Sequence, residues 1–336
     1  MSARYQPIGF YTLARPFLFL LPPEKAHHLS LRGLALAGRV PPFRMLNKIF
    51  APPLEPIECC GLQFPNRIGM AAGYDKNALA LDGLAAMGFG HIEVGTITPR
   101  PQKGNPYPRV VRIPKEDALV NRLGFPNEGV SIIKKRILSY RQRATSLKNP
   151  PVLGINIGKN KDTPNERAKE DYLLCYRELA TLADYMVINI SSPNTPGLRA
   201  LQNQEALLHL LSPIQEEAQK LKKAPPLFVK LSPDLSISTR EELLQQLHAL
   251  NVDGVILSNT QKTQEPFAGG KSGLPLRESS LNIIRACREQ LPKTTIIASG
   301  GIGLDGDTQT FVEAGADLIQ IWTALVYRGP SLLRNL

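Results

Sequence analysis

The sequence predicts a protein of the α/β class, built as a closed (β/α)8 barrel, or TIM barrel, with a small N-terminal two-helix extension. Eight short apolar runs alternate along the chain with amphipathic stretches of helical periodicity. Most of these runs are apolar at every position, as strands buried on both faces of a parallel sheet must be. A doubly wound open sheet is the alternative, but no G-x-G-x-x-G pattern follows the first run, where Gly73 lies.

The apolar runs that predict the barrel strands are residues 67–71, 91–96, 152–157, 185–190, 227–231, 254–258, 295–299 and 318–322. Amphipathic stretches predict helices at residues 77–87, 166–183, 204–222, 239–250, 281–290 and 307–314. Between residues 96 and 152 the sequence shows several prolines and the polar run 121–125, so we expect a long loop there. A loop of this length inside a compact domain usually carries function.

Residues 1–50 are predicted to form an N-terminal helical segment, and residues 51–336 the barrel domain. Pro22 and Pro23 separate two short predicted helices, the second of which begins near Glu24. Prolines mark the predicted linker between this segment and the barrel, at positions 41, 42, 52, 53 and 56.

The N-terminal segment is both basic and apolar. The chain has a formal net charge of +11, and residues 1–50 contain seven Lys or Arg residues against one acid. Large apolar side chains lie between these charges, which suits a membrane surface better than a nucleic acid. The longest apolar run there is residues 17–21, far short of the ~20 residues that span a bilayer. We therefore expect a peripheral membrane segment, with a helical cap over the barrel as the alternative.

The stretch 189–197 (NISSPNTPG) holds the densest group of candidate site residues. It begins in an apolar strand and breaks into a turn with two prolines, and ligands of parallel barrels bind where strands end. Asn189, Ser191, Ser192 and Asn194 supply amides and hydroxyls that could bind a flat polar substrate and move one proton. The alternative is an ordinary polar turn, because Ser, Pro and Asn are common turn formers.

The other predicted strand ends carry amides, lysines and hydroxyls, with few carboxylates and no metal-ligand cluster. This set favours a cofactor-dependent reaction over hydrolysis, which would need a paired acid and base. Gly300 and Gly301, after the seventh strand, either hold a phosphate or form a tight turn. Lys230 emerges from a buried strand and needs an anionic partner, which a flavin carrying negative charge would supply. Lys76 pairs with a substrate carboxylate or is an exposed loop lysine.

Taken together, the motifs resemble the quinone-linked, membrane-associated class (class 2) of dihydroorotate dehydrogenases. The resemblance covers nearly the whole chain, and many ordered motifs carry it. They are PEKAH (23–27), AAGYDK (71–76), EVGTITPRP (93–101), NRLGF (121–125), GINIGKN (154–160), NISSPNTPG (189–197), VKLSPD (229–234), SGLPL (272–276) and GGI (300–302).

The resemblance implies oxidation of dihydroorotate to orotate in pyrimidine synthesis, with hydride transfer to FMN and reoxidation by a membrane quinone of the ubiquinone type. Ser192 would be the catalytic base, with Thr195 as a member of its proton relay. It implies FMN binding by Ala72, Gly73, Tyr74, Asp75, Lys76, Thr96, Asn156, Asn189, Lys230, Ser258, Gly273, Gly301, Trp322 and Thr323. It implies dihydroorotate binding by Lys76, Asn121, Arg122, Leu123, Gly124, Phe125, Asn189, Asn194, Asn259 and Thr260.

The resemblance also places His27 and Arg112 near the quinone head group, and the enzyme peripherally on the cytoplasmic side of the cell membrane. Three positions depart from the family pattern: Ser258 replaces a frequent threonine, Trp322 a common tyrosine, and Pro126 a frequent asparagine. The alternatives are a soluble dihydroorotate dehydrogenase that uses fumarate or NAD, a non-redox barrel enzyme that binds a sugar phosphate, and a basic nucleic-acid-binding protein. We expect no nucleic-acid partner, because the polar residues converge on strand ends.

Overall fold

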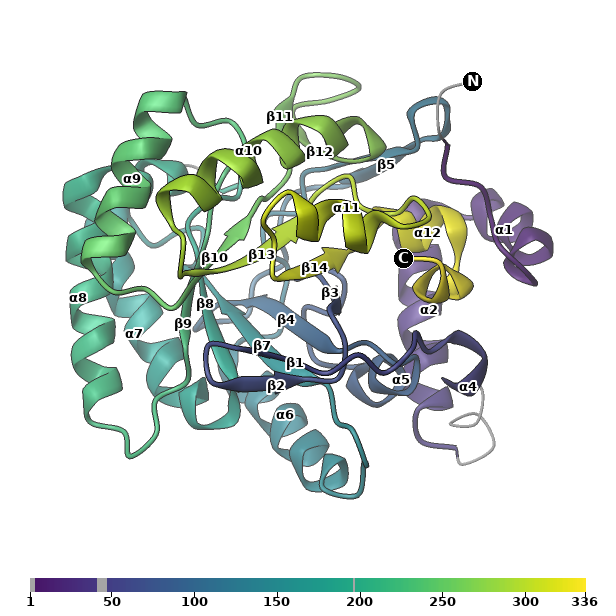
Figure 1. Cartoon of the computed structure of the whole chain (residues 1–336), viewed down its shortest axis with the longest axis horizontal. Helices are drawn as coiled ribbons and strands as arrows, with labels where there is room; N and C mark the ends of the chain where they lie inside the picture. The colour runs from purple at the N-terminus through teal and green to yellow at the C-terminus, as the bar shows by residue number, and fades with distance from the viewer. Residues whose placement is uncertain (1–3, 41–46, 196) are drawn as a thin grey trace.

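In the computed structural model, which describes residues 4–40, 47–195 and 197–336, eight parallel strands close into a barrel. Pro41 and Pro42 of the predicted linker, and Pro196 of the 189–197 stretch, lie outside the described residues. Figure 1 shows the strands at the centre, with helices around them. In spatial order the strands are β10 (Gly254–Leu257), β13 (Thr295–Ser299), β14 (Leu318–Ile321), β3 (Ile68–Met70), β4 (His91–Ile97), β7 (Val152–Ile157), β8 (Tyr185–Asn189) and β9 (Leu227–Lys230). The predicted barrel is confirmed.

The outer helices cover the barrel because each presents an apolar face to the strands. They are α5 (Leu81–Ala86), α6 (Val130–Ala144), α7 (Ala168–Leu179), α8 (Gln204–Gln219), α9 (Ile237–Ala249), α10 (Arg277–Gln290), α11 (Asp307–Glu313) and α12 (Thr323–Arg328). The helix predicted over residues 77–87 is shorter than expected. The Asp75 carboxylate accepts hydrogen bonds from the backbone N–H groups of Leu79 and Ala80, and Ala78 has a φ of 53°. A left-handed residue does not continue a helix, so α5 begins only at Leu81.

The prediction of a long loop between residues 96 and 152 is wrong in part. It contains α6 and two short strands, β5 (Val110–Ile113) and β6 (Ala118–Asn121), which pair antiparallel. With β11 (Gln261–Thr263) and β12 (Gly269–Gly273) they form a second sheet in the order β11-β12-β6-β5. Because β11 follows the end of β10, this sheet lies over the carboxyl ends of the barrel strands and walls one side of the barrel mouth.

A small hairpin lies at the amino end of the barrel. Its strands, β1 (Ile57–Cys59) and β2 (Leu62–Phe64), pair antiparallel. The buried side chain of Phe64 joins Tyr185 and Phe228 in an apolar cluster separate from the main core. Apolar packing therefore fills this end of the barrel, and the polar site lies at the other.

The N-terminal residues fold as the predicted two-helix extension, α1 (Tyr11–Leu20) and α2 (Pro23–Ala37), followed by the short α4 (Asn47–Phe50). Pro23 starts α2 and Glu24 lies in its first turn, both favourable at a helix N-terminus. The Tyr5 hydroxyl donates to the carbonyl of Gly301 at 2.8 Å, and the Tyr11 hydroxyl to that of Val326 at 2.7 Å. No described helix has the length and hydrophobicity to cross a bilayer. The domain boundary at residue 50 stays a prediction.

Candidate active site

The carboxyl ends of the barrel strands surround a cavity lined by most of the predicted site residues. The predicted cofactor residues around it are Ala72, Gly73, Lys76, Thr96, Asn189, Lys230, Ser258, Gly273, Gly301, Trp322 and Thr323. The predicted substrate residues around it are Lys76, Asn121, Leu123, Gly124, Phe125, Asn189, Asn194, Asn259 and Thr260, with Ser192 beside them. The fold thus brings together residues that are up to about 250 positions apart in the chain.

A hydrogen-bonded layer of side chains from three neighbouring strands forms part of the cavity floor. The Asn189 amide, at the end of β8, donates to Thr96 Oγ1 at 2.9 Å and to Asn156 Oδ1 at 3.2 Å. Thr96 Oγ1 in turn donates to Asn156 Oδ1 at 2.5 Å. All three side chains are buried, and their mutual hydrogen bonds fix the orientation of each amide.

Glu93 lies beneath this layer and was missed by the sequence analysis. Its carboxylate, fully buried on β4, accepts hydrogen bonds from the side-chain amides of Asn156 at 2.7 Å and Gln320 at 2.6 Å. Lys230 Nζ lies 3.6 Å from Glu93 Oε1. The expectation that a bound flavin would supply the counter-charge of Lys230 therefore needs correction, because the protein already supplies a carboxylate. A single acid between the apolar residues Ile92 and Val94 of a buried strand was the signal in the sequence.

The loop after β8 carries Ser192 and is tied to the neighbouring loops. Ser192 is buried, and its Oγ accepts the backbone N–H of Asn194 at 3.2 Å. The Asn194 amide donates to Asn121 Oδ1 at 3.0 Å, which links this loop to β6. Arg199, also missed from the sequence, donates to the Ser191 carbonyl at 3.0 Å and forms an ion pair with Asp234 at 2.7 Å. These contacts hold the Ser192 hydroxyl at the cavity wall.

Opposite Ser192, Asn259 and Thr260 follow β10. The Asn259 amide donates to Ser191 Oγ at 2.9 Å, and its carbonyl accepts the backbone N–H of Thr260 at 2.7 Å. Thr260 lines the cavity, and its buried Oγ1 has no hydrogen-bond partner among the described residues. An unpartnered buried hydroxyl is unfavourable, so this group is suited to bind a polar ligand.

Glycines shape the far side of the cavity. Gly273, Gly300 and Gly301 have φ values of 106°, 118° and 77°, which residues with a side chain rarely adopt. A Cβ on Gly301 would lie 2.3 Å from the backbone nitrogen of Arg277. These positions leave backbone groups accessible beside the hydroxyls of Ser272 and Thr323, whose oxygens are 2.8 Å apart. Such a set can bind a phosphate.

Four predicted residues do not line this cavity. Asn156 belongs to the hydrogen-bonded floor but does not line the cavity itself, and Tyr74 and Asp75 line a second cavity instead. The Arg122 side chain points away: its Nε donates to the Pro108 carbonyl at 2.9 Å, and its guanidinium lies over the Phe267 ring. Its predicted contact with the substrate has no side-chain basis in this arrangement.

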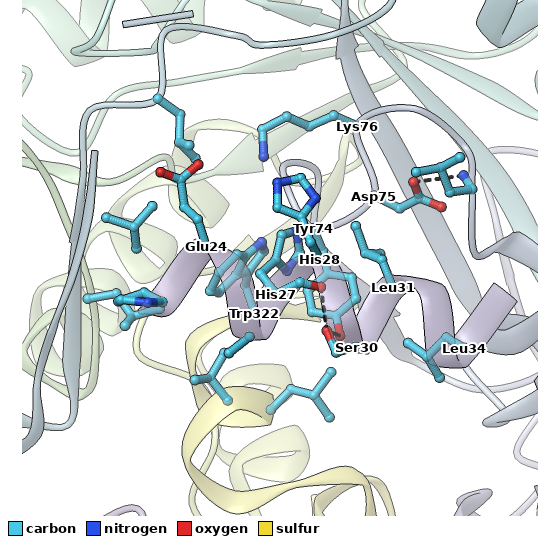
Figure 2. Close-up of a pocket in the computed structure, with 18 of the residues that line it drawn as sticks. Glu24, His27, His28, Ser30, Leu31, Leu34, Tyr74, Asp75, Lys76 and Trp322 are labelled. Atoms are coloured by element: carbon cyan, nitrogen blue, oxygen red, sulfur yellow. Dashed lines mark hydrogen bonds between the residues drawn. The ribbon is translucent and has the colours of Figure 1, made fainter. Parts of the chain in front are cut away.

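The second cavity, of about 410 Å³, lies between the N-terminal helices and the barrel. His27 and Arg112, predicted near a quinone head group, both line it. Figure 2 shows His27 on α2 beside Tyr74 and Trp322. The His27 ring stacks on Trp322 with centroids 5.8 Å apart and meets Tyr74 edge-on at 5.0 Å. Burial lowers the pKa of His27 to about 3, so this imidazole is neutral at physiological pH.

Arg112 also fixes the end of α1. Its guanidinium donates to the carbonyls of Leu18, Phe19 and Leu21, and lies 4.5 Å from the centre of the Phe19 ring. A guanidinium can bond carbonyls here because the last turn of a helix lacks N–H donors from a following turn. Arg112 therefore couples the wall of the second cavity to the position of α1.

The two cavities share a wall. Lys76, Val110, Leu119, Leu123 and Trp322 line both. The Lys76 ammonium donates to the carbonyl of Gly73 and lies across from α2 in the close-up (Figure 2). The pKa of Lys76 is lowered to about 8, chiefly by burial; the charge of Glu24 opposes this shift and the charge of Arg109 adds to it.

Comparison with known proteins agrees with this arrangement. The family model described as dihydroorotate dehydrogenase matches residues 56–336. The chain is 46% identical to "dihydroorotate dehydrogenase (quinone)" of Delftia acidovorans over 96% of this chain and 95% of that protein. It is 44% identical to the protein of the same name from Dichelobacter nodosus, over 97% of this chain and 96% of that one.

A crystal structure of ligand-free DHODH from Eimeria tenella superposes with a TM-score of 0.85 at 36% identity, covering 93% of this chain and 92% of that one. The fold of nearly the whole chain thus recurs in a protein that shares more than a third of the aligned residues with this one. On this evidence, the chain belongs to the dihydroorotate dehydrogenase family.

Proposed function

We propose that the protein oxidises dihydroorotate to orotate in pyrimidine synthesis and passes the electrons through FMN to a membrane quinone. The observation that supports this most directly is the pair of adjoining cavities. One, built on the strand ends, is lined by several amides, hydroxyls and two lysines, and the other, built on the N-terminal helices, is largely apolar. A soluble fumarate- or NAD-linked enzyme, or a non-redox phosphate-binding barrel, would have no use for the second cavity.

The residues at the strand ends fit FMN. The glycines at positions 273, 300 and 301 suit its phosphate, and the Lys230 ammonium suits the polar edge of its ring. When bound, FMN supplies a two-electron acceptor. The amides of Asn121, Asn194 and Asn259, with the free Thr260 hydroxyl, would bind the substrate ring, and Lys76 its carboxylate.

Ser192 would remove the C5 proton of dihydroorotate. A serine hydroxyl is a weak base, so the proton must pass on from its Oγ through a relay. Thr195 is buried in the same loop and is the side chain we assign to that relay. Ser192 is 4% exposed, so its hydroxyl is shielded from bulk water.

The second cavity would hold the quinone, with its tail toward α1. Phe10, Leu13, Phe17 and Leu20 are 80%, 66%, 73% and 82% exposed. Their spacing places them on one face of the helix, here named the α1 apolar face. Figure 1 shows α1 at the edge of the molecule, beyond α12. An exposed apolar surface of this kind suits the interface of a membrane, and we place the protein on its cytoplasmic side.

An anaerobic titration tests this function. The purified protein is expected to be yellow, and dihydroorotate should bleach its flavin absorbance in a stoichiometric reaction. Adding a long-chain quinone carried in phospholipid vesicles should restore the absorbance. A colourless protein would contradict the flavin assignment. Reoxidation by fumarate or NAD, or by a soluble quinone but not by one held in vesicles, would contradict the membrane-quinone assignment.

The pKa of Lys76 predicts how substrate affinity depends on pH. The ammonium is fully protonated well below pH 8 and loses its charge as the pH rises through about 8. We therefore expect kcat/KM for dihydroorotate to fall about tenfold per pH unit above this value. In the variant Lys76→Arg the falling limb should vanish, because guanidinium stays charged. An unchanged limb in that variant would exclude Lys76 as its cause.

A further inference from the structure

The Glu93 carboxylate has no part in the proposed reaction, yet it is the acid nearest to Lys230 among the described contacts. It is 0% exposed, and its three polar neighbours come from β7, β9 and β14. Glu93 does not line the cavity at the strand ends, here called the upper cavity, whereas Lys230 does. The ammonium therefore lies between the buried carboxylate and whatever occupies the cavity.

Electrostatics gives this order of charges a consequence. A buried carboxylate is unfavourable unless it is paired and hydrogen-bonded, and Lys230, Asn156 and Gln320 meet both needs. In return, the carboxylate offsets part of the positive charge of Lys230. In a site of low dielectric constant such an offset acts on a neighbouring charge over several ångströms.

We propose that Glu93 is a positioning residue that fixes Lys230 and tunes the electron affinity of the flavin by offsetting the lysine charge. This inference rests on the proposed function, in which FMN occupies the upper cavity beside Lys230. A flavin gains negative charge on reduction, and a fully effective ammonium would stabilise that charge strongly. The partly neutralised pair stabilises it less, so the reduced cofactor remains able to give up its electrons.

A purely structural role for Glu93 makes a different prediction. Its hydrogen bonds to Asn156 and Gln320 also join β4 to β7 and β14. If that were its only role, replacing it would lower the stability of the barrel and leave the midpoint potential of the bound flavin unchanged. The potential therefore separates the two roles, and activity alone does not.

The decisive variant is Glu93→Gln, which keeps the size of the side chain and removes its charge. The equilibrium constant for two-electron reduction of the bound flavin should rise about tenfold, which corresponds to a midpoint potential about 30 mV more positive. It is measured by titration with dithionite against a reference dye. Asp171→Asn, which removes one negative charge from the outer helix α7, is the matched control and should leave the potential unchanged.

Glu93→Asp gives a second measurement that still decides if the glutamine variant fails to fold or to retain flavin. Aspartate keeps the charge but draws it back by one methylene, so the equilibrium constant should rise by about threefold. The inference is overturned if the glutamine variant has the same midpoint potential as the unmodified protein. If only the aspartate variant retains flavin, an unchanged potential in that variant overturns it. The titration needs neither dihydroorotate nor quinone. An unchanged potential would therefore contradict this inference without contradicting the proposed function. The proposed function fails instead if the unmodified protein contains no flavin.

Discussion

Replacing Ser192 with alanine is expected to slow flavin reduction by dihydroorotate about 10²- to 10⁴-fold, the usual contribution of a general base. The flavin should stay bound, because Ser192 Oγ bonds only the backbone N–H of Asn194 among the described contacts. Loss of that one hydrogen bond lowers the free energy of unfolding by roughly 1 kcal/mol. The measurement is the rate of bleaching after anaerobic mixing with dihydroorotate in a stopped-flow instrument.

Ser191→Ala is the matched control for this experiment. Ser191 is the preceding residue, but its hydroxyl bonds Asn189 and Asn259 and does not line the cavity. Its loss should slow bleaching less than tenfold. If the bleaching rate fell by the same factor in both variants, the effect would come from disturbance of the loop and not from loss of a base. Bleaching at the full rate in Ser192→Ala would remove the assignment of the base.

Filling the second cavity should separate the two half-reactions. Ala26 lines this cavity from α2 and is almost buried, so Ala26→Trp places an indole where we expect the quinone. We expect the KM for quinone to rise at least about tenfold, because the lost contact area was apolar. The rate of flavin bleaching by dihydroorotate should stay within about twofold. Steady-state assays with varied quinone and single-turnover assays without quinone measure the two effects.

The control for the filled cavity is Leu36→Trp, on the same helix. Leu36 is 67% exposed and lines neither cavity, so an indole there should change neither half-reaction. Thermal unfolding of the three proteins shows whether Ala26→Trp overpacks the helix interface, which would lower the melting temperature. An unaltered KM for quinone in a folded Ala26→Trp variant would place the quinone elsewhere.

The barrel could be predicted because its signal is local. Strands such as β7 and β8 are buried at every position, and their sequences are apolar throughout apart from the candidate site residues Asn156 and Asn189. Once the strands are known, the geometry of a parallel barrel brings their carboxyl ends together, so residues as distant as Lys76 and Thr323 could be assigned to one site.

The features that sequence analysis missed depend on partners distant in the chain. The strand β5 is four residues long and half-buried, and it is stable only by pairing with β6 in a sheet that β11 and β12 complete. Glu93 lay within a run interpreted as apolar, and its meaning emerges only beside Lys230. Arg199 follows the turn and was not singled out, because its partner Asp234 comes from another loop.

The wall that the two cavities share, to which Lys76 and Trp322 contribute, affects how the two reactants bind. In the proposed function, dihydroorotate would bind in the cavity at the strand ends and the quinone in the second cavity, on opposite sides of this wall. Neither has to leave before the other arrives. Under the proposed function, electrons would cross this wall from the substrate cavity to the quinone cavity while the two reactants stay apart.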